Sequence, residues 1–282
     1  MPTRAFKQVD VFTTTPYRGN PLAVVLDGTD LDTATMQHFT NWTNLSECTF
    51  VLPPTPEGAA AGADYRVRIF CPGRELPFAG HPTLGTCHAW LQAGGTPRGE
   101  QVVQECGVGL VKIQRDGDRL AFAAPPLRRG GPLDEADLAL IARGLGVARE
   151  DISAHAWCDN GPQWRGVMLR SAEQVLALRP DAECLEGLEI GVVAPQTSGE
   201  TQFEVRAFFP GNHSLTEDPV TGSLNAALAQ WLIGAGLAPD RYVAAQGTVL
   251  AREGRVHIQR DAGGTIWVGG ASVTCIDGLV QL

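Results

Sequence analysis

One short passage occurs twice in this chain, and the internal repeat constrains the fold more than any other feature of the sequence. Residues 203–211 (FEVRAFFPG) repeat residues 65–73 (YRVRIFCPG) at an offset of 138. Residues 256–261 (VHIQRD) repeat residues 111–116 (VKIQRD) at an offset of 145. Because the order is kept and the period is too long for a solenoid, the repeats predict two related domains of about 140 residues each.

Composition and charge narrow the class of partner. The 282 residues are 44% hydrophobic and carry a formal net charge of −9, so a core can form in each half. Binding to nucleic acid or to an anionic membrane rests on basic patches, and we expect neither here. We also expect no signal peptide or membrane span, because no apolar run is long enough. The predicted partner is a small molecule, and the predicted location is the cytoplasm.

Seven cysteines are scattered along the chain without a Cys-x-x-Cys pair. An odd number at irregular spacing indicates neither a disulfide framework nor a structural zinc site. We therefore expect free, buried thiols and no metal site.

A segment rich in proline and glycine, residues 123–132 (AAPPLRRGGP), is the predicted linker between the halves. The expected domains are residues 1–125 and 126–282, with the last strand free to cross back to the first half. A helix is predicted from Leu31 to Trp42 with Asp30 as its N-cap. A second helix, from Asp134 to Leu145 and ended by Gly146, is expected as its counterpart in the second half.

The most informative positions follow the first repeat. If the offset of 138 is extended, Gly80 aligns with Asp218 and Thr83 with Thr221, and an Ala-rich helical stretch follows in each half. Pro219 favours the first helical turn, so Asp218 is the predicted N-cap. Backbone N–H groups at two helix N-termini that face one cleft would bind a carboxylate. The first turns of these helices are expected to contain His81 in the first half and Thr221, Gly222 and Ser223 in the second.

Each of these residues also has an ordinary structural interpretation. Asp218 as a simple N-cap would stabilise its helix by ~1 kcal/mol. Glu47 could be a solvated charge at a strand edge, and His81 between Gly and Pro could be a turn residue. Single residues therefore do not decide the function.

Taken together, four motifs in one order make the chain resemble the PhzF family of phenazine-biosynthesis isomerases over nearly its whole length. The matching passages are residues 19–25 (GNPLAVV), 44–47 (NLSE) with 49–51 (TFV), 68–70 (RIF) with 75–85 (ELPFAGHPTLG), and 217–223 (EDPVTGS). Cys48 departs from the family pattern but leaves Glu47 intact. The resemblance implies an α+β fold of the diaminopimelate epimerase type, with two pseudo-symmetric domains that each wrap a curved sheet round a central helix. It also implies an active site between the domains, a homodimer, and proton transfer without a cofactor.

The same resemblance assigns roles to single residues. Glu47 falls at the acid/base glutamate of the family, within Asn-Leu-Ser-Glu. His81, Asp218 and Ser223 fall at polar groups that hold the substrate, and Gly80 and Gly222 stand beside them.

The reaction that follows is an isomerisation by one carboxylate. Racemases of this fold use two cysteines, one at each helix N-terminus, because inversion needs an acid and a base on opposite faces. No cysteine lies within six residues of Gly80 or Asp218. The predicted function is therefore isomerisation of trans-2,3-dihydro-3-hydroxyanthranilate or a related substrate. Two alternatives remain open, a racemase or epimerase without the cysteine pair and a non-catalytic metabolite-binding protein.

Overall fold

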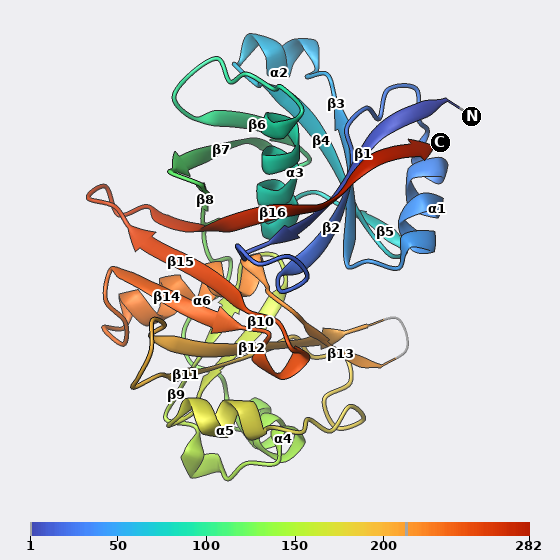
Figure 1. The fold of residues 1–282 in the computed structure, drawn as a ribbon. Coiled ribbons are helices and arrows are strands. Elements are labelled where there is room, and N and C mark those ends of the chain that lie inside the picture. The colour runs from blue at the N-terminus through green and yellow to red at the C-terminus, as the bar shows by residue number, and fades with distance from the viewer. Residues whose placement is uncertain (1, 212–213) are drawn as a thin grey trace. The chain divides into compact units, whose positions relative to one another are not determined.

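The structure, a computed structural model, describes residues 2–211 and 214–282 (Figure 1). The chain divides into two compact units, which we call the first and second units. The first contains the residues up to Ala123 together with Gly269–Leu282, and the second is Ala124–Val268.

The first unit is a closed sheet around one helix. Its strands are β1 (Thr3–Val11), β2 (Asn20–Val25), β3 (Glu47–Leu52), β4 (Tyr65–Cys71), β5 (Arg74–Leu76), β6 (Val102–Cys106), β7 (Gly109–Asp116), β8 (Arg119–Ala123) and most of β16 (Ile266–Gln281). Its helices are α1 (Thr33–Thr43), α2 (Pro56–Ala60) and α3 (Gly80–Gln92). The order β1-β2-β3-β4-β6-β7-β8-β16 closes because β16 also pairs with β1, and β5 pairs with β4.

The helix α3 lies inside this sheet, in contact with β1, β2, β3, β6 and β8. Such an enclosed helix needs small side chains where strands approach it. A Cβ added at Gly85 would lie 2.6 Å from Leu22 Cδ2 and 2.8 Å from Val11 Cγ2, so glycine lets α3 approach β1 and β2 closely.

The second unit is built in a related way. Its strands are β9 (Ala154–Asp159), β10 (Gln163–Met168), β11 (Ile190–Pro195), β12 (Phe203–Pro210), β13 (Leu215–Asp218), β14 (Arg241–Gln246) and β15 (Gly254–Arg260). Its helices are α4 (Glu135–Leu145), α5 (Ala172–Ala177) and α6 (Gly222–Gly234), with short 3₁₀ turns η1 (Arg149–Asp151) and η2 (Thr248–Leu250). The order is β9-β10-β11-β12-β14-β15, and β13 pairs with β12. Because α6 contacts β9, β10 and β15, the sheet curves around it.

The pairing pattern of the first unit recurs in the second. The pairs β2–β3 and β4–β6 are parallel, as are β10–β11 and β12–β14. This mixed sheet around a helix agrees with the predicted α+β class. That residues 1 to about 125 and about 150 to 282 superpose on each other stays a prediction.

Two helix predictions need correction. The helix predicted from Asp134 to Leu145 is confirmed as α4, with Asp134 Oδ1 accepting the Asp137 N–H. It is not the counterpart of α1, however, because α4 precedes β9, whereas α5 joins β10 to the parallel strand β11 as α1 joins β2 to β3. The N-cap of α1 is Asp32 rather than Asp30, since Asp32 Oδ1 accepts the Thr35 N–H at 2.7 Å.

The alignment of Gly80 with Asp218 is wrong, and the strand register shows why. Phe70 of β4 pairs with Glu75, and its repeat partner Phe208 of β12 pairs with Glu217. These pairs are five and nine residues apart along the chain, so the second hairpin is four residues longer. Asp218 therefore corresponds to Leu76 of β5. Gly80 corresponds to Gly222, and each begins its enclosed helix.

Ion pairs support this corrected alignment. Arg68 on β4 donates through Nε and Nη2 to both carboxylate oxygens of Glu75, at 2.8 and 2.6 Å. Arg206 on β12 makes the same two bonds to Glu217, at 2.8 and 2.7 Å. The same ion pair with two parallel hydrogen bonds therefore links β4 to β5 and β12 to β13.

All seven cysteines are free, as predicted, but only Cys48, Cys87 and Cys158 are buried. Within residues 2–211 and 214–282, no helix is long and apolar enough to cross a membrane.

The two ion pairs differ in burial, which gives a matched test of their stability. The Arg206 and Glu217 side chains are 4% and 13% exposed, against 18% and 39% for Arg68 and Glu75. We expect Glu217→Ala to lower the free energy of unfolding by about 3–5 kcal/mol, because it leaves the buried Arg206 guanidinium without its carboxylate partner. Glu75→Ala should cost about 1 kcal/mol or less. Urea denaturation measures both, and equal losses would contradict the difference.

Candidate active site

Glu47 and His81 lie together at the start of α3. The helix α1 ends at Asn44 in the left-handed conformation (φ 55°), and after a short turn Glu47 opens β3. His81 is the second residue of α3. Glu47 Oε2 and His81 Nδ1 are 3.4 Å apart, and the side chains are 18% and 5% exposed. Glu47 is thus neither a solvated charge nor remote from the predicted substrate-binding histidine.

The imidazole of His81 is neutral at ordinary pH. Burial lowers the pKa of His81 to about 3, an effect that the backbone carbonyl of Pro21 opposes only in part. The approach to Glu47 is consequently a contact between a carboxylate and a neutral ring rather than a salt bridge. A neutral ring can offer one N–H donor without placing a positive charge beside the carboxylate.

The two enclosed helices begin differently from the outer ones. Side chains of Asp32 and Asp134 cap α1 and α4. By contrast, α3 and α6 begin at Gly80 and Gly222 with no side-chain cap bond. Their first backbone N–H groups have no partner within the helix and carry the positive end of the helix dipole, which favours an anion.

Asp218 is held in place but is not the N-cap that the sequence predicts. It is the last residue of β13, and the N-cap of α6 is Thr221. Thr221 Oγ1 donates to Asp218 Oδ2 at 2.6 Å. The longer hairpin explains the difference, because it ends β13 at Asp218 and leaves three residues before the helix.

Two neighbours hold Ser223 in the first turn of α6. Its Oγ accepts a bond from Trp164 Nε1 at 3.1 Å, and its backbone carbonyl accepts one from Asn160 Nδ2 at 2.8 Å. Because the indole can only donate, the serine hydroxyl keeps its own hydrogen for another acceptor. The sequence predicts Thr221 in the first turn of this helix, and the structure makes it the N-cap; Trp164 and Asn160 were not predicted as site residues. The one available signal is that a buried indole N–H needs a partner.

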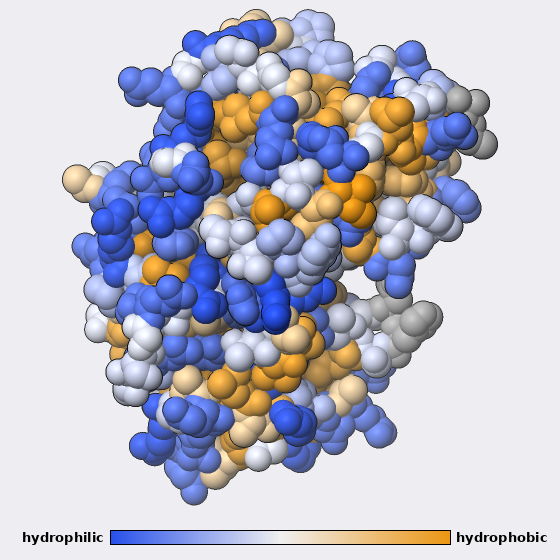
Figure 2. All heavy atoms as spheres, in the orientation of Figure 1, coloured by the Kyte–Doolittle hydropathy of each residue, from blue (hydrophilic) through white to orange (hydrophobic). Residues whose placement is uncertain are grey.

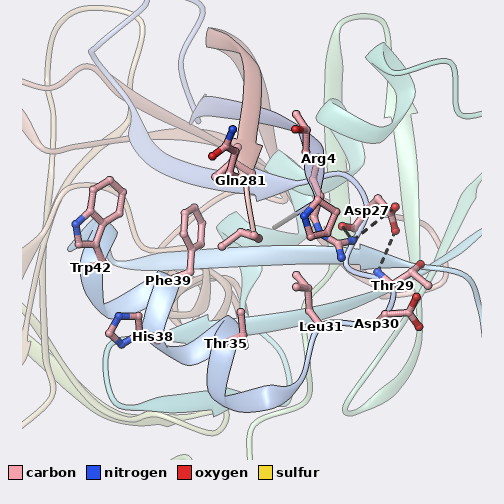
Figure 3. A pocket seen from close by; sticks show the side chains of 14 residues that line it. Arg4, Asp27, Thr29, Asp30, Leu31, Thr35, His38, Phe39, Trp42 and Gln281 are labelled. Atoms are coloured by element: carbon pink, nitrogen blue, oxygen red, sulfur yellow. Dashed lines mark hydrogen bonds and ion pairs between the residues drawn. The ribbon is translucent and has the colours of Figure 1, made fainter.

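A cavity of about 980 Å³ lies elsewhere on the first unit (Figure 3). Phe39 and Trp42 of α1 line it with His38, and Arg4 reaches from β1 toward Asp27 (Figure 3). None of the six predicted site residues lines it. Figure 2 shows apolar surface over the ends of β1 and β16, at the upper right of the view. We do not assign this cavity to the active site, because the predicted site residues lie outside its lining and its Arg4 guanidinium donates to the Asp27 carbonyl at 2.8 Å.

No group of three or more His, Cys, Asp and Glu side chains in the described part of the chain is arranged to hold a metal ion.

Comparison with known proteins identifies the family. The family model described as phenazine biosynthesis-like protein (PhzC-PhzF) matches residues 9–278. "Antisense-enhancing sequence 1" of Schizosaccharomyces pombe is 35% identical and covers 99% of both chains. The trans-2,3-dihydro-3-hydroxyanthranilate isomerase of Pseudomonas aeruginosa is 32% identical over 91% of this chain and 90% of its own.

Solved structures agree on the fold. A PhzF-family protein of Bacillus anthracis matches over 100% of both chains with a TM-score of 0.84 at 22% identity. A hydroxyproline epimerase from Agrobacterium vitis matches with a TM-score of 0.59 at 13% identity, over 99% of this chain and 93% of its own. Relatives that are 32% identical over most of the chain are named isomerases, so the chain is an enzyme of the isomerase class. The chain belongs to the phenazine biosynthesis-like (PhzC-PhzF) family.

The buried neutral histidine predicts a pH dependence of stability. The folded pKa of His81, about 3, is below the unfolded value of 6.5, so the unfolded chain binds the proton more readily between these values. The free energy of unfolding should therefore fall as pH drops below 6.5, by up to about 1.4 kcal/mol per pH unit from this residue. We expect His81→Asn to flatten this slope between pH 6.5 and 4. Parallel curves for the two proteins, measured by urea denaturation, would contradict the prediction.

Proposed function

We propose that the chain is a cofactor-independent isomerase in which Glu47 moves a proton within a small substrate that bears a carboxylate. The observation that carries the proposal is the Glu47 carboxylate, 3.4 Å from the neutral ring of His81 at the uncapped start of α3. A base, a hydrogen-bonding group and an anion-binding helix end stand within one small region of the first unit.

The chemistry balances without an oxidant or reductant. Glu47 takes a proton from an activated allylic carbon, and the electrons of that C–H bond enter the conjugated system. The resulting carboxylic acid then returns the proton to another carbon of the same system. Because His81 is neutral, no adjacent cation weakens the carboxylate as a base.

The remaining predicted residues bind the substrate in this proposal. Backbone N–H groups at Gly80 and Gly222 attract its carboxylate, since both begin helices without a side-chain cap. Asp218 and Ser223 contact polar groups of the substrate, and Trp164 leaves the Ser223 hydroxyl free to donate.

Racemisation by two thiols is disfavoured by the placement of the cysteines. Cys87 is seven residues into α3 from Gly80, and burial raises its pKa to about 12. Cys71 ends β4, and burial also raises its pKa. Neither thiol is a ready base at neutral pH, because the thiolate is the reactive form.

The proposed prototype substrate is trans-2,3-dihydro-3-hydroxyanthranilate. Two relatives that are 32% identical to this chain are named as isomerases of this compound. A homodimer, the usual assembly that the family resemblance implies, belongs to the same proposal. Light scattering on the purified protein would measure the assembly directly.

Replacement of Glu47 tests the proposed proton carrier. Glu47→Gln keeps the shape of the side chain but cannot accept a proton, so we expect turnover to fall ~10²- to 10⁴-fold with nearly unchanged substrate binding. Deuterium from solvent should enter the product at one carbon with the wild type and not with the variant. The assay is turnover of trans-2,3-dihydro-3-hydroxyanthranilate in D₂O, followed by NMR.

Glu75→Gln is the matched control, because it removes another carboxylate of the same unit, one that pairs with the partly exposed Arg68. It should retain wild-type turnover. If Glu47→Gln kept more than about a third of the wild-type rate, Glu47 would be a structural residue. Tight binding of the substrate by the wild type without solvent exchange would instead identify a non-catalytic binding protein.

A further inference from the structure

We propose that Gln246 is a positioning residue that orients Asp218 through Thr221, an inference that rests on the proposed contact between Asp218 and substrate. Gln246 is the last residue of β14, and it is 1% exposed. Its side-chain amide bonds to both ends of the segment that joins β13 to α6. No motif in the sequence marks it, and it stands 25 residues after Thr221.

The hydrogen bonds of Gln246 fix the direction of its amide. Oε1 accepts from the Thr221 backbone N–H at 3.0 Å and from Asn225 Nδ2 at 2.8 Å. Since a backbone N–H can only donate, the oxygen of the amide must face this side. Nε2 therefore faces the other side, where it donates to the Asp218 carbonyl at 3.1 Å and to Thr221 Oγ1 at 2.9 Å.

This direction determines where the Thr221 hydroxyl hydrogen points. The hydroxyl oxygen accepts from Gln246, so its single hydrogen is available for Asp218 Oδ2, 2.6 Å away. A short bond from a hydroxyl to a carboxylate is among the stronger hydrogen bonds of a protein. The chain of donors runs from Gln246 to Thr221 to Asp218 and holds the carboxylate in one rotamer.

Other residue types at position 246 would not form the same set of hydrogen bonds. Methionine has a similar length but neither donor nor acceptor of comparable strength. An ionised glutamate would place an oxygen against the Asp218 carbonyl and Thr221 Oγ1, where a donor is needed. A protonated glutamate again offers one acceptor and one donor, so it should restore the pattern in part.

The test is a set of double mutants assayed on trans-2,3-dihydro-3-hydroxyanthranilate. We expect Gln246→Met and Thr221→Val each to lower kcat/KM ~10- to 100-fold, because a positioned carboxylate becomes mobile. In an Asp218→Asn background, Gln246→Met should cost less than about threefold, since the carboxylate it orients is gone. The kcat/KM of Gln246→Glu should rise as pH falls and the glutamate becomes protonated. The pH profile of the wild type should lack this rise.

Gln230→Met is the matched control. Gln230 on α6 also donates from a half-buried amide to a backbone carbonyl, that of Pro125, at 2.8 Å. This variant should keep wild-type kcat/KM.

Three outcomes would overturn the role of Gln246. The first is wild-type kcat/KM in Gln246→Met, and the second is an equal loss in the Asp218→Asn background. The third, which applies if Gln246→Met does not fold, is an equal loss from Thr221→Val with and without Asp218→Asn.

A readout without turnover separates this inference from the proposed function. The ¹³C resonance of the Asp218 carboxylate should move in Gln246→Met and Thr221→Val but not in Gln230→Met. A wild type that is inactive on this substrate but shows these shifts would contradict the proposed function alone. An unmoved resonance would contradict the role of Gln246 alone.

Discussion

The structure depends on enclosing one helix within the sheet of each unit. Nine of the thirteen residues of α3 are buried, and nine of the thirteen of α6. Enclosure requires small or apolar side chains along each helix, which leaves the helix N-terminus as the place where polar groups gather. Both helices begin at a glycine without a side-chain cap. In each unit polar side chains therefore collect around that helix end, Glu47 and His81 in the first unit and Asp218 and Thr221 in the second.

The same enclosure sets the chemistry of the neighbouring groups. Burial at the start of α3 keeps His81 neutral, so the adjacent Glu47 is not paired with a cation. Around the start of α6, burial requires every polar group to find a partner, and the Gln246 amide meets that need for Thr221 and Asp218. One physical cause thus accounts for a neutral ring in one unit and an ordered hydrogen-bond chain in the other.

The alignment of the two halves shows which parts of the internal repeat can be predicted from sequence similarity alone. The strands β4 and β12 were recognisable because five matching residues keep one offset. The offset fails beyond the turn, where the second hairpin is four residues longer, and a chance match of Thr83 with Thr221 concealed the change. The ion pairs of Arg68 with Glu75 and of Arg206 with Glu217 reveal this difference in hairpin length. Each pair joins residues that only the folded hairpin brings together.

The sequence by itself determined the family, the α+β class, the helix predicted from Asp134 to Leu145, and Glu47 as a candidate base, because motifs and caps are local. Only the tertiary structure decided that Gly80 matches Gly222 and that Gln246 bonds to Thr221. Hairpin register and contacts between residues far apart in the chain depend on how strands pair and what they bury, and no single segment contains that information.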